Sequence, residues 1–141
     1  MLSAWRLEDD LDSILAAPSI DREALRGGRL LLTGGTGFIG RWLLETLQQA
    51  NDRLGLDLRI TVPSRRPELF RQRASHLLAN GKLTLVPLDL AKSPPIGNFT
   101  HIIHAATDAS ATLNEEAPLT VFRTIVRGTE QVLELAASQA G

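Results

Sequence analysis

The sequence of 141 residues contains no cysteine and no tyrosine, and only 4% of its residues are aromatic. Without cysteine there is no disulfide framework, thiolate zinc site or cysteine nucleophile, and a reducing cytoplasm is the expected location. Without tyrosine, no mechanism that needs a phenol can operate within this chain. A chain of this length buries roughly two thirds of its unfolded surface, so a hydrophobic core can hold it together without covalent or metal staples. We therefore expect one domain and not two.

Neither sign of charge dominates, because 15 basic residues stand against 16 acidic ones, for a formal net charge of −1. This balance gives no electrostatic reason to expect a nucleic-acid or anionic membrane partner. Long apolar runs are also lacking, since none approaches the roughly 18 residues that a membrane span needs. The acidic residues from Glu8 to Asp12 do not suit a signal peptide. We therefore expect a soluble, cytoplasmic chain.

An N-terminal extension, residues 1–28, precedes the main pattern of the sequence. Its apolar residues recur at helical spacing until Pro18 stops the helix. These residues are Trp5, Leu7, Leu11, Ile14 and Leu15. A second short helical piece, 21–26, ends at Gly27-Gly28. We interpret the extension as a packing or interface element and not as a catalytic one.

From residue 29 onward, short apolar runs alternate with longer stretches of helical periodicity. Strands are expected at 30–32, 58–62, 83–88 and 102–103, and helices at 38–50, 67–80 and from 118 onward. In the first helix, Ile39, Leu43, Leu44 and Leu47 share one face. Such alternation is typical of parallel strands joined by right-handed helical crossovers. The predicted fold class is α/β, a Rossmann-type doubly wound parallel sheet truncated after about four strands.

The most informative segment runs from Thr33 to Gly40 and reads Thr-Gly-Gly-Thr-Gly-Phe-Ile-Gly between an expected strand and an expected helix. It satisfies the dinucleotide-binding spacing G-x-G-x-x-G through Gly35, Gly37 and Gly40. In this pattern Gly37 lets a diphosphate approach the backbone, and Gly40 lets the helix lie against the sheet. The helix N-terminus offers free N–H groups to that diphosphate. A Walker phosphate loop is excluded because no Gly-Lys-Ser or Gly-Lys-Thr follows, whereas a glycine turn that serves packing alone stays the alternative.

The second expected strand ends in the sequence Val-Pro-Ser-Arg-Arg, residues 62–66. In a Rossmann unit, an acidic residue at this point binds the adenosine ribose, whereas arginine accommodates the 2′-phosphate of NADP. Arg65 or Arg66 can pair with a phosphate through two hydrogen bonds, and Ser64 can donate a third. We therefore predict that residues 29–141 form an incomplete NAD(P)-binding domain that favours NADP. The alternative is that both arginines are solvated.

Several segments, in order, resemble the extended short-chain dehydrogenase/reductase family, the NAD-dependent epimerases and dehydratases that modify nucleotide sugars. The glycine loop is similar to that family's cofactor loop almost residue for residue. Asp89-Leu90 resembles its Asp-hydrophobic pair after the third strand, and residues 102–107 resemble its strand-four signature, apolar residues followed by His-x-Ala-Ala. Residues 126–136 resemble its Asn-Val-x-Gly-Thr helix with the Leu-Glu-x-Ala continuation.

The resemblance implies a role for each matched residue. Asp89 is expected to hydrogen-bond the adenine amino group, with Leu90 beside the ring, and small residues after the fourth strand are expected to let the cofactor pass. Two positions depart from the family pattern, because Thr107 replaces an alanine and Ile125 replaces the helix asparagine. With the phosphate-binding residues included, the predicted cofactor site is Gly34, Gly35, Thr36, Gly37, Phe38, Ile39, Gly40, Ser64, Arg65, Arg66, Asp89, Leu90, Ala105, Ala106 and Thr107.

The family's chemistry requires a Tyr-x-x-x-Lys pair that the resemblance places after a fifth strand. This chain has no tyrosine, and its two lysines, Lys82 and Lys92, precede the fourth strand. We therefore assign no catalytic residue and expect the N-terminal part of a larger enzyme, which would transfer hydride at nicotinamide and act on a nucleotide sugar. Two alternatives stay open, a non-catalytic dinucleotide-sensing or interaction module on the same fold, and a domain whose glycine loop binds nothing.

Two further expectations concern the fourth strand. The family's strand order would leave this strand at an apolar sheet edge, and such edges seek partners, so we expect self-association there. For His104 we expect a structural role, as a partly buried residue bonded to backbone at the strand end. His76 and His101 have no partner at ligand spacing, and no cluster suggests a metal site.

Overall fold

A computed structural model describes residues 7–17, 21–107 and 115–139 of the chain. Within these residues, one parallel sheet has the strand order β3-β2-β1-β4. Its strands are β1 (Arg29–Thr33), β2 (Arg59–Ser64), β3 (Leu83–Pro87) and β4 (His101–His104). The sheet confirms the predicted fold class and places β4 at one edge.

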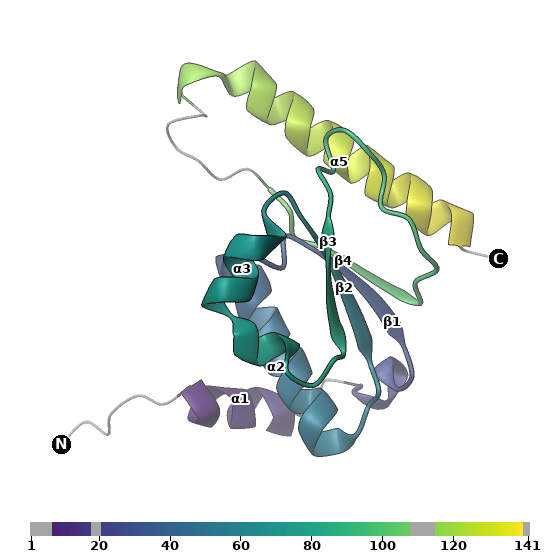
Figure 1. Cartoon of the computed structure of the whole chain (residues 1–141). Helices are drawn as coiled ribbons and strands as arrows, with labels where there is room; N and C mark the ends of the chain where they lie inside the picture. The colour runs from purple at the N-terminus through teal and green to yellow at the C-terminus, as the bar shows by residue number, and fades with distance from the viewer. Residues whose placement is uncertain (1–6, 18–20, 108–114, 140–141) are drawn as a thin grey trace.

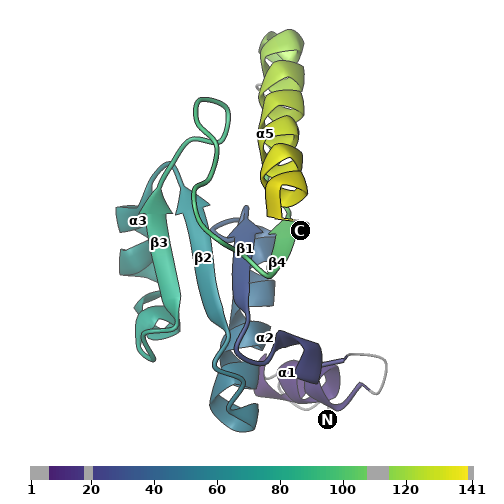
Figure 2. The same ribbon diagram turned by 90° about the vertical axis from the view of Figure 1, so that its right-hand side faces the viewer.

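Helices cover both faces of the sheet (Figure 1). The described helices are α1 (Leu7–Ala16), α2 (Phe38–Leu54), α3 (Pro67–Arg73), α5 (Pro118–Gln139) and the short 3-10 turns η1 (Glu23–Leu25) and η2 (Ser75–Leu78). Helices α2 and α3 lie on one side of the sheet and α5 on the other, which is the doubly wound arrangement. Figure 2 shows that α5 extends past the carboxyl ends of the strands.

Helix α1, which belongs to the N-terminal extension, packs against α2. Leu11 is buried at 5% exposure, and Asp12 forms an ion pair with Arg53 near the end of α2. Trp5 and Pro18, which the sequence analysis assigned to this helix and its end, lie outside the described residues. The extension also packs Leu15 and Leu25 against the main core, and Arg26 donates to the carbonyl oxygens of Leu54 and Gly55 at the end of α2.

Strand β1 is buried on both faces. Leu30 and Leu32 belong to the main hydrophobic core, which also contains Leu44 of α2. Leu31 is fully buried outside this cluster, as expected for a side chain on the opposite face of the strand. Continuous burial of this kind is typical of a central parallel strand and explains why β1 reads as an uninterrupted apolar run.

The helix expected over 67–80 is broken in the structure. Helix α3 ends at Arg73, and Ala74, with φ −142° and ψ 42°, turns the chain before η2 begins. Ala74 is fully buried, and the carbonyl oxygen of Leu77 accepts a hydrogen bond from the Gln48 side chain of α2. The prediction of one continuous helix was wrong, because Ala74 leaves the helical conformation and the Leu77 N–H donates to the Ala74 carbonyl oxygen three residues earlier in a 3-10 turn.

Some residues that share a helix face by periodicity do not share the same environment. Leu44 and Leu47 of α2 are buried, whereas Ile39, in the first turn of the same helix, is 62% exposed. Helix α5 buries a stripe that includes Gly128 and Val132. Its exposed apolar side chains are Leu119, Phe122, Val126 and Leu133.

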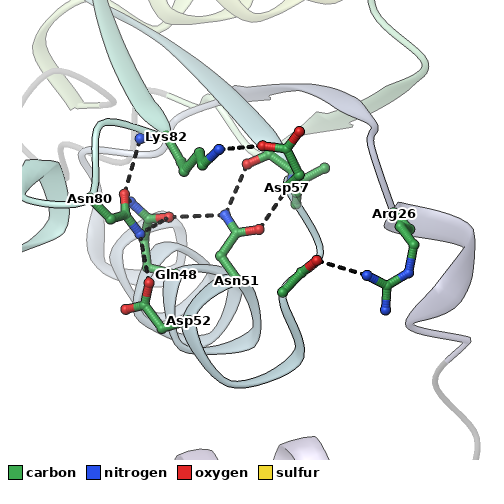
Figure 3. Close-up of polar contacts among 9 residues, drawn as sticks. Arg26, Gln48, Asn51, Asp52, Asp57, Asn80 and Lys82 are labelled. Carbon is green, nitrogen blue, oxygen red and sulfur yellow. Dashed lines mark hydrogen bonds and ion pairs between the residues drawn. The ribbon is translucent and has the colours of Figure 1, made fainter.

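A network of amide side chains closes the amino-terminal end of the sheet (Figure 3). Asn51 of α2 donates to the carbonyl oxygen of Leu58 at 2.9 Å and accepts from the Leu58 N–H at 2.9 Å. Gln48 donates to the Asn80 side chain at 3.0 Å. These bonds satisfy buried backbone groups where β2 begins. The cleft of the molecule lies at the opposite, carboxyl end of the sheet.

Candidate functional site

A cleft of about 370 Å³ opens at the carboxyl ends of the strands, where the segments that follow β1, β2, β3 and β4 meet α5. In open parallel α/β sheets, ligands bind at this end. The predicted site residues that line the cleft are Gly34, Thr36, Gly37, Ser64, Arg65, Arg66, Asp89, Leu90, Ala105, Ala106 and Thr107. The predicted residues that do not line it are Gly35, Phe38, Ile39 and Gly40.

The glycine loop owes its shape to close backbone packing. Gly34 has φ +72°, and a Cβ there would lie 2.4 Å from the Ala105 carbonyl oxygen. A Cβ on Gly40 would lie 2.1 Å from the Gly34 carbonyl oxygen. Gly40 therefore brings the first turn of α2 against the loop itself, whereas the sequence analysis expected contact with the sheet. The loop, the end of β4 and the start of α2 form one tightly packed unit.

The N-terminus of α2 opens onto the cleft. Its first flanking residue, Gly37, lines the cleft and caps the helix with no side-chain hydrogen bond. The following N–H groups therefore lack a side-chain acceptor at the positive end of the helix dipole. Phe38 and Ile39 are 79% and 62% exposed and do not line the cleft. Any contribution of these two residues to a diphosphate would come from their backbone.

Positive charge gathers where β2 ends. Ser64 is buried, and its hydroxyl oxygen accepts the Arg66 N–H at 3.3 Å, which fixes the start of the loop. Arg65 and Arg66 line the cleft as predicted, and Arg73 of α3 joins them there. Among the described residues, no carboxylate forms an ion pair with Arg66 or Arg73. These two guanidinium groups are thus available to an anionic ligand.

Arg73 was not predicted as a site residue, although its spacing from Arg66 indicates that it belongs to the same side of the cleft. Helix α3 begins directly after Arg66, and residues three, four and seven positions later return to the same side of a helix. Leu69, Phe70 and Arg73 stand at those positions, and all three line the cleft. Other lining residues that were not predicted are Pro63, Leu88, Ala91, His104, Thr124, Ile125 and Gly128.

The segment after β3 supplies the acidic side of the cleft. One carboxylate oxygen of Asp89 accepts the Ala91 N–H at 3.1 Å, and the other lies 3.6 Å from the Lys92 ammonium. Leu90 lies beside α5, because a Cβ added to Gly128 would come within 3.7 Å of the Leu90 Cβ. Asp89 is therefore held in place by its own turn, while the turn is held against α5.

His104 ends β4 and bridges two elements. Its Nδ1 lies 2.6 Å from the Thr33 hydroxyl oxygen, and its Nε2 lies 3.1 Å from the Thr129 hydroxyl oxygen. Burial lowers the pKa of His104 below its ordinary value. The expected hydrogen bond from His104 to backbone was wrong, because two threonine hydroxyls from β1 and α5 take that place.

The described residues hold neither a metal-ligand cluster nor a membrane-spanning helix. Among the described residues, no three His, Asp or Glu side chains gather as metal ligands. No helix in the described part of the chain is long and apolar enough to cross a membrane.

The fold and the cleft together define a dinucleotide-binding domain. A glycine loop joins the central strand to an uncapped helix N-terminus, arginines stand at the end of β2, and an aspartate stands at the end of β3. In doubly wound sheets, dinucleotides bind at the carboxyl ends of the strands, beside the glycine turn and the helix N-terminus that follow the first strand.

The family model of the NAD dependent epimerase/dehydratase family matches residues 30–141, and the chain belongs to this family. Its fold is similar to that of the UDP-Glc/GlcNAc 4-epimerase from Campylobacter jejuni, with 20% sequence identity and a TM-score of 0.59. That match covers 79% of this chain and 34% of the epimerase chain, so this chain spans about a third of the epimerase's length. No curated protein matches the sequence.

Proposed function

We propose that the chain is the NADP-binding part of an enzyme that modifies a nucleotide sugar by hydride transfer at nicotinamide. The observation that carries this proposal is the convergence of the uncapped α2 N-terminus, the β2 arginines and Asp89 on one cleft. In such an enzyme the nicotinamide accepts or returns the hydride, and the protein positions it. Residues of this chain would bind and orient the cofactor.

The preference for NADP rests on the guanidinium groups at the end of β2. Arg66 and Arg73 line the cleft from the loop and from α3, and neither is neutralised by a carboxylate of the described residues. A 2′-phosphate placed between them would receive charge-assisted hydrogen bonds from both sides. The ribose hydroxyl of NAD offers no comparable charge, so the same residues contribute less to NAD binding.

Calorimetric titration with NADP and NAD tests this preference. We expect NADP to bind more tightly, and Arg73→Gln to weaken NADP binding by about tenfold while leaving NAD binding unchanged, because one charged hydrogen-bond partner is lost. Arg71→Gln is the matched control, since Arg71 lies on the same helix, pairs with Glu68 and does not line the cleft. Tighter binding of NAD would contradict the preference, and binding of neither nucleotide would contradict the proposed cofactor.

Sugar chemistry belongs, in this proposal, to a longer protein. The chain contains no tyrosine, so it lacks the Tyr-x-x-x-Lys pair that the family resemblance requires. We expect no epimerisation of a UDP-sugar by the 141 residues alone. A reading frame that continues past Gly141 into a Tyr-x-x-x-Lys segment would support the enzyme, whereas a stop codon there would support a non-catalytic dinucleotide-sensing module.

Self-association through the edge of β4 forms part of the same proposal. In the described sheet β4 pairs on one side only, with β1, and Ile103 is 37% exposed. Sedimentation velocity at rising protein concentration should show association, and Ile103→Lys should reduce it, because lysine on an edge strand blocks edge pairing. Ile96→Lys is the control, since Ile96 is 92% exposed outside the strands. Equal association of the two variants would contradict a role for this edge.

A further inference from the structure

His104 sits at the joint between the strand ends that form one wall of the cleft. The backbone N–H of Ala105 donates to the Thr33 carbonyl oxygen at 3.2 Å, and that of Ala106 donates to the Thr33 hydroxyl oxygen at 3.3 Å. Gly34 packs against the backbone of the same two alanines. Ala105 is therefore held by the backbone of Thr33, whereas the position of Ala106 depends on the orientation of the Thr33 side chain. His104 contacts that side chain directly.

The hydrogen bonds around His104 select one protonation state. Thr129 donates its hydroxyl hydrogen to the Ile125 carbonyl oxygen at 2.9 Å, so its oxygen can only accept from His104. His104 must then carry its hydrogen on Nε2. Its Nδ1 is left as an acceptor and takes the hydroxyl hydrogen of Thr33 at 2.6 Å. Only the neutral Nε2–H form of His104 gives a partner to both imidazole nitrogens and to the hydroxyl hydrogens of Thr33 and Thr129.

We propose that His104 is a positioning residue for the nucleotide cleft: as the neutral Nε2–H tautomer it orients the Thr33 hydroxyl and so sets the position of Ala106 in the cleft wall. A hydrogen-bonded chain then runs from the Ala106 N–H through Thr33, His104 and Thr129 to α5. The His104 imidazole thus links β1, through Thr33, to α5, through Thr129. This inference rests on the proposed function only where it predicts an effect of His104 on nucleotide affinity.

Protonation of His104 disrupts the chain at Thr33. An imidazolium donates from both nitrogens, so the Thr33 oxygen would receive hydrogens from His104 and from Ala106 while its own hydroxyl hydrogen lost its acceptor. Thr33 is fully buried, and the hydrogen bonds of the described residues offer it no other acceptor. A buried donor without a partner is unfavourable, which opposes protonation.

The surroundings of His104 agree with a neutral ring. Burial alone lowers its pKa, and no charged group contributes to the shift. On β1, the contacting residue is the uncharged Thr33. On α5, Thr129 is flanked by the exposed side chains of Arg127 and Glu130. The cleft itself carries the charged groups Asp89, Arg65, Arg66 and Arg73.

Nitrogen-15 NMR of the imidazole rings tests the assignment without any nucleotide. We expect His104 to carry its hydrogen on Nε2 and its pKa to lie below the ordinary histidine value. The backbone amide signals of Gly34 and Ala106 should follow the same titration. A hydrogen on Nδ1, or amide signals that do not respond when His104 titrates, would overturn the proposal.

His104→Asn separates positioning from simple structural support. Its side-chain oxygen can take the place of Nδ1 as the acceptor for Thr33, but it does not titrate. NAD is the probe, because its diphosphate keeps its charge between about pH 5 and about pH 8, the range in which histidine titrates. As pH falls through this range, the affinity of the wild-type chain for NAD should decrease about fivefold or more, consistent with one unsatisfied buried donor.

The two variants should differ in their pH profiles. His104→Asn should bind NAD with nearly constant affinity across the range, whereas His101→Asn, on the same strand and outside the cleft lining, should retain the wild-type loss. A fall in the affinity of His104→Asn equal to that of the wild type would overturn the proposal. If no variant binds NAD at any pH, the proposed cofactor fails, and the NMR titration alone decides the role of His104.

Discussion

Gly34 is a residue at which two independent constraints meet. Its φ of +72° lies in the left-handed region, where a side chain costs about 1–2 kcal/mol. A Cβ would also lie 2.4 Å from the carbonyl oxygen of Ala105. The second constraint comes from β4, which is distant in sequence, so the glycine joins the loop to the cleft wall as well as making the turn.

Gly34→Ala should therefore destabilise the fold by about 2–4 kcal/mol, because conformational strain and backbone displacement add. The matched control is Gly55→Ala, at φ +58°, where no atom lies within 4 Å of the added Cβ. That variant should lose only about 1 kcal/mol, the cost of the left-handed conformation alone. Urea unfolding measures both values, and equal losses would show that the contact with Ala105 is unimportant.

At the scale of elements, α5 is attached to the domain at separate points along its length. Thr129 accepts from His104 in the middle of the helix. Near its end, the Gln139 side chain accepts the Phe99 N–H at 2.7 Å and donates to the Gly97 carbonyl oxygen at 2.7 Å. The apolar residues of its outer face stay exposed, so these polar contacts matter more than they would in a helix buried on all sides.

Gln139→Ala should loosen α5 because it removes both hydrogen bonds to the 97–99 turn. We expect a loss of about 1–2 kcal/mol in unfolding free energy and faster amide hydrogen exchange in the second half of α5. Ser138→Ala is the control, since Ser138 bonds only to Leu135 of its own helix. Equal amide hydrogen exchange of α5 in both variants would show that the Gln139 hydrogen bonds to Gly97 and Phe99 do not hold the helix in place.

At the scale of the whole molecule, three groups tie stability to pH in one direction. Burial lowers the pKa of His104. The pKa of Asp57 is lowered by its hydrogen bond with Lys82, and that of Glu23 by its hydrogen bond with Arg26. In each case the unfolded chain binds the proton more readily than the folded chain does, so stability is present at higher pH and is lost as pH falls.

The unfolding free energy should therefore fall in two stages on acidification. The first stage begins below the ordinary histidine pKa of about 6.5, and the second follows in the range where carboxylates titrate. His104→Asn should remove the first stage and retain the second, which denaturant unfolding at a series of pH values would show. A first stage that persists in this variant would have to come from another group.

Much of the cleft could be predicted from the sequence because its parts are local. The glycine spacing, the arginines after β2 and the aspartate after β3 each follow a strand directly, and the carboxyl ends of parallel strands meet at one edge of a sheet. Predicted residues from all four strand ends accordingly line one cleft, although Gly35, Phe38, Ile39 and Gly40 do not. Their roles toward a cofactor, the domain boundaries and the cytoplasmic location stay predictions.

The sequence by itself determined the order of strands and helices, since hydrophobic periodicity and turn residues act over a few positions. Only the tertiary structure decided contacts between distant segments. It brought Thr33 and Thr129 to the two nitrogens of His104, broke the helix at Ala74 and left Ile39 exposed. A local pattern specifies which face of an element is apolar, whereas the partner that covers this face, or satisfies a polar group on it, depends on how the elements pack.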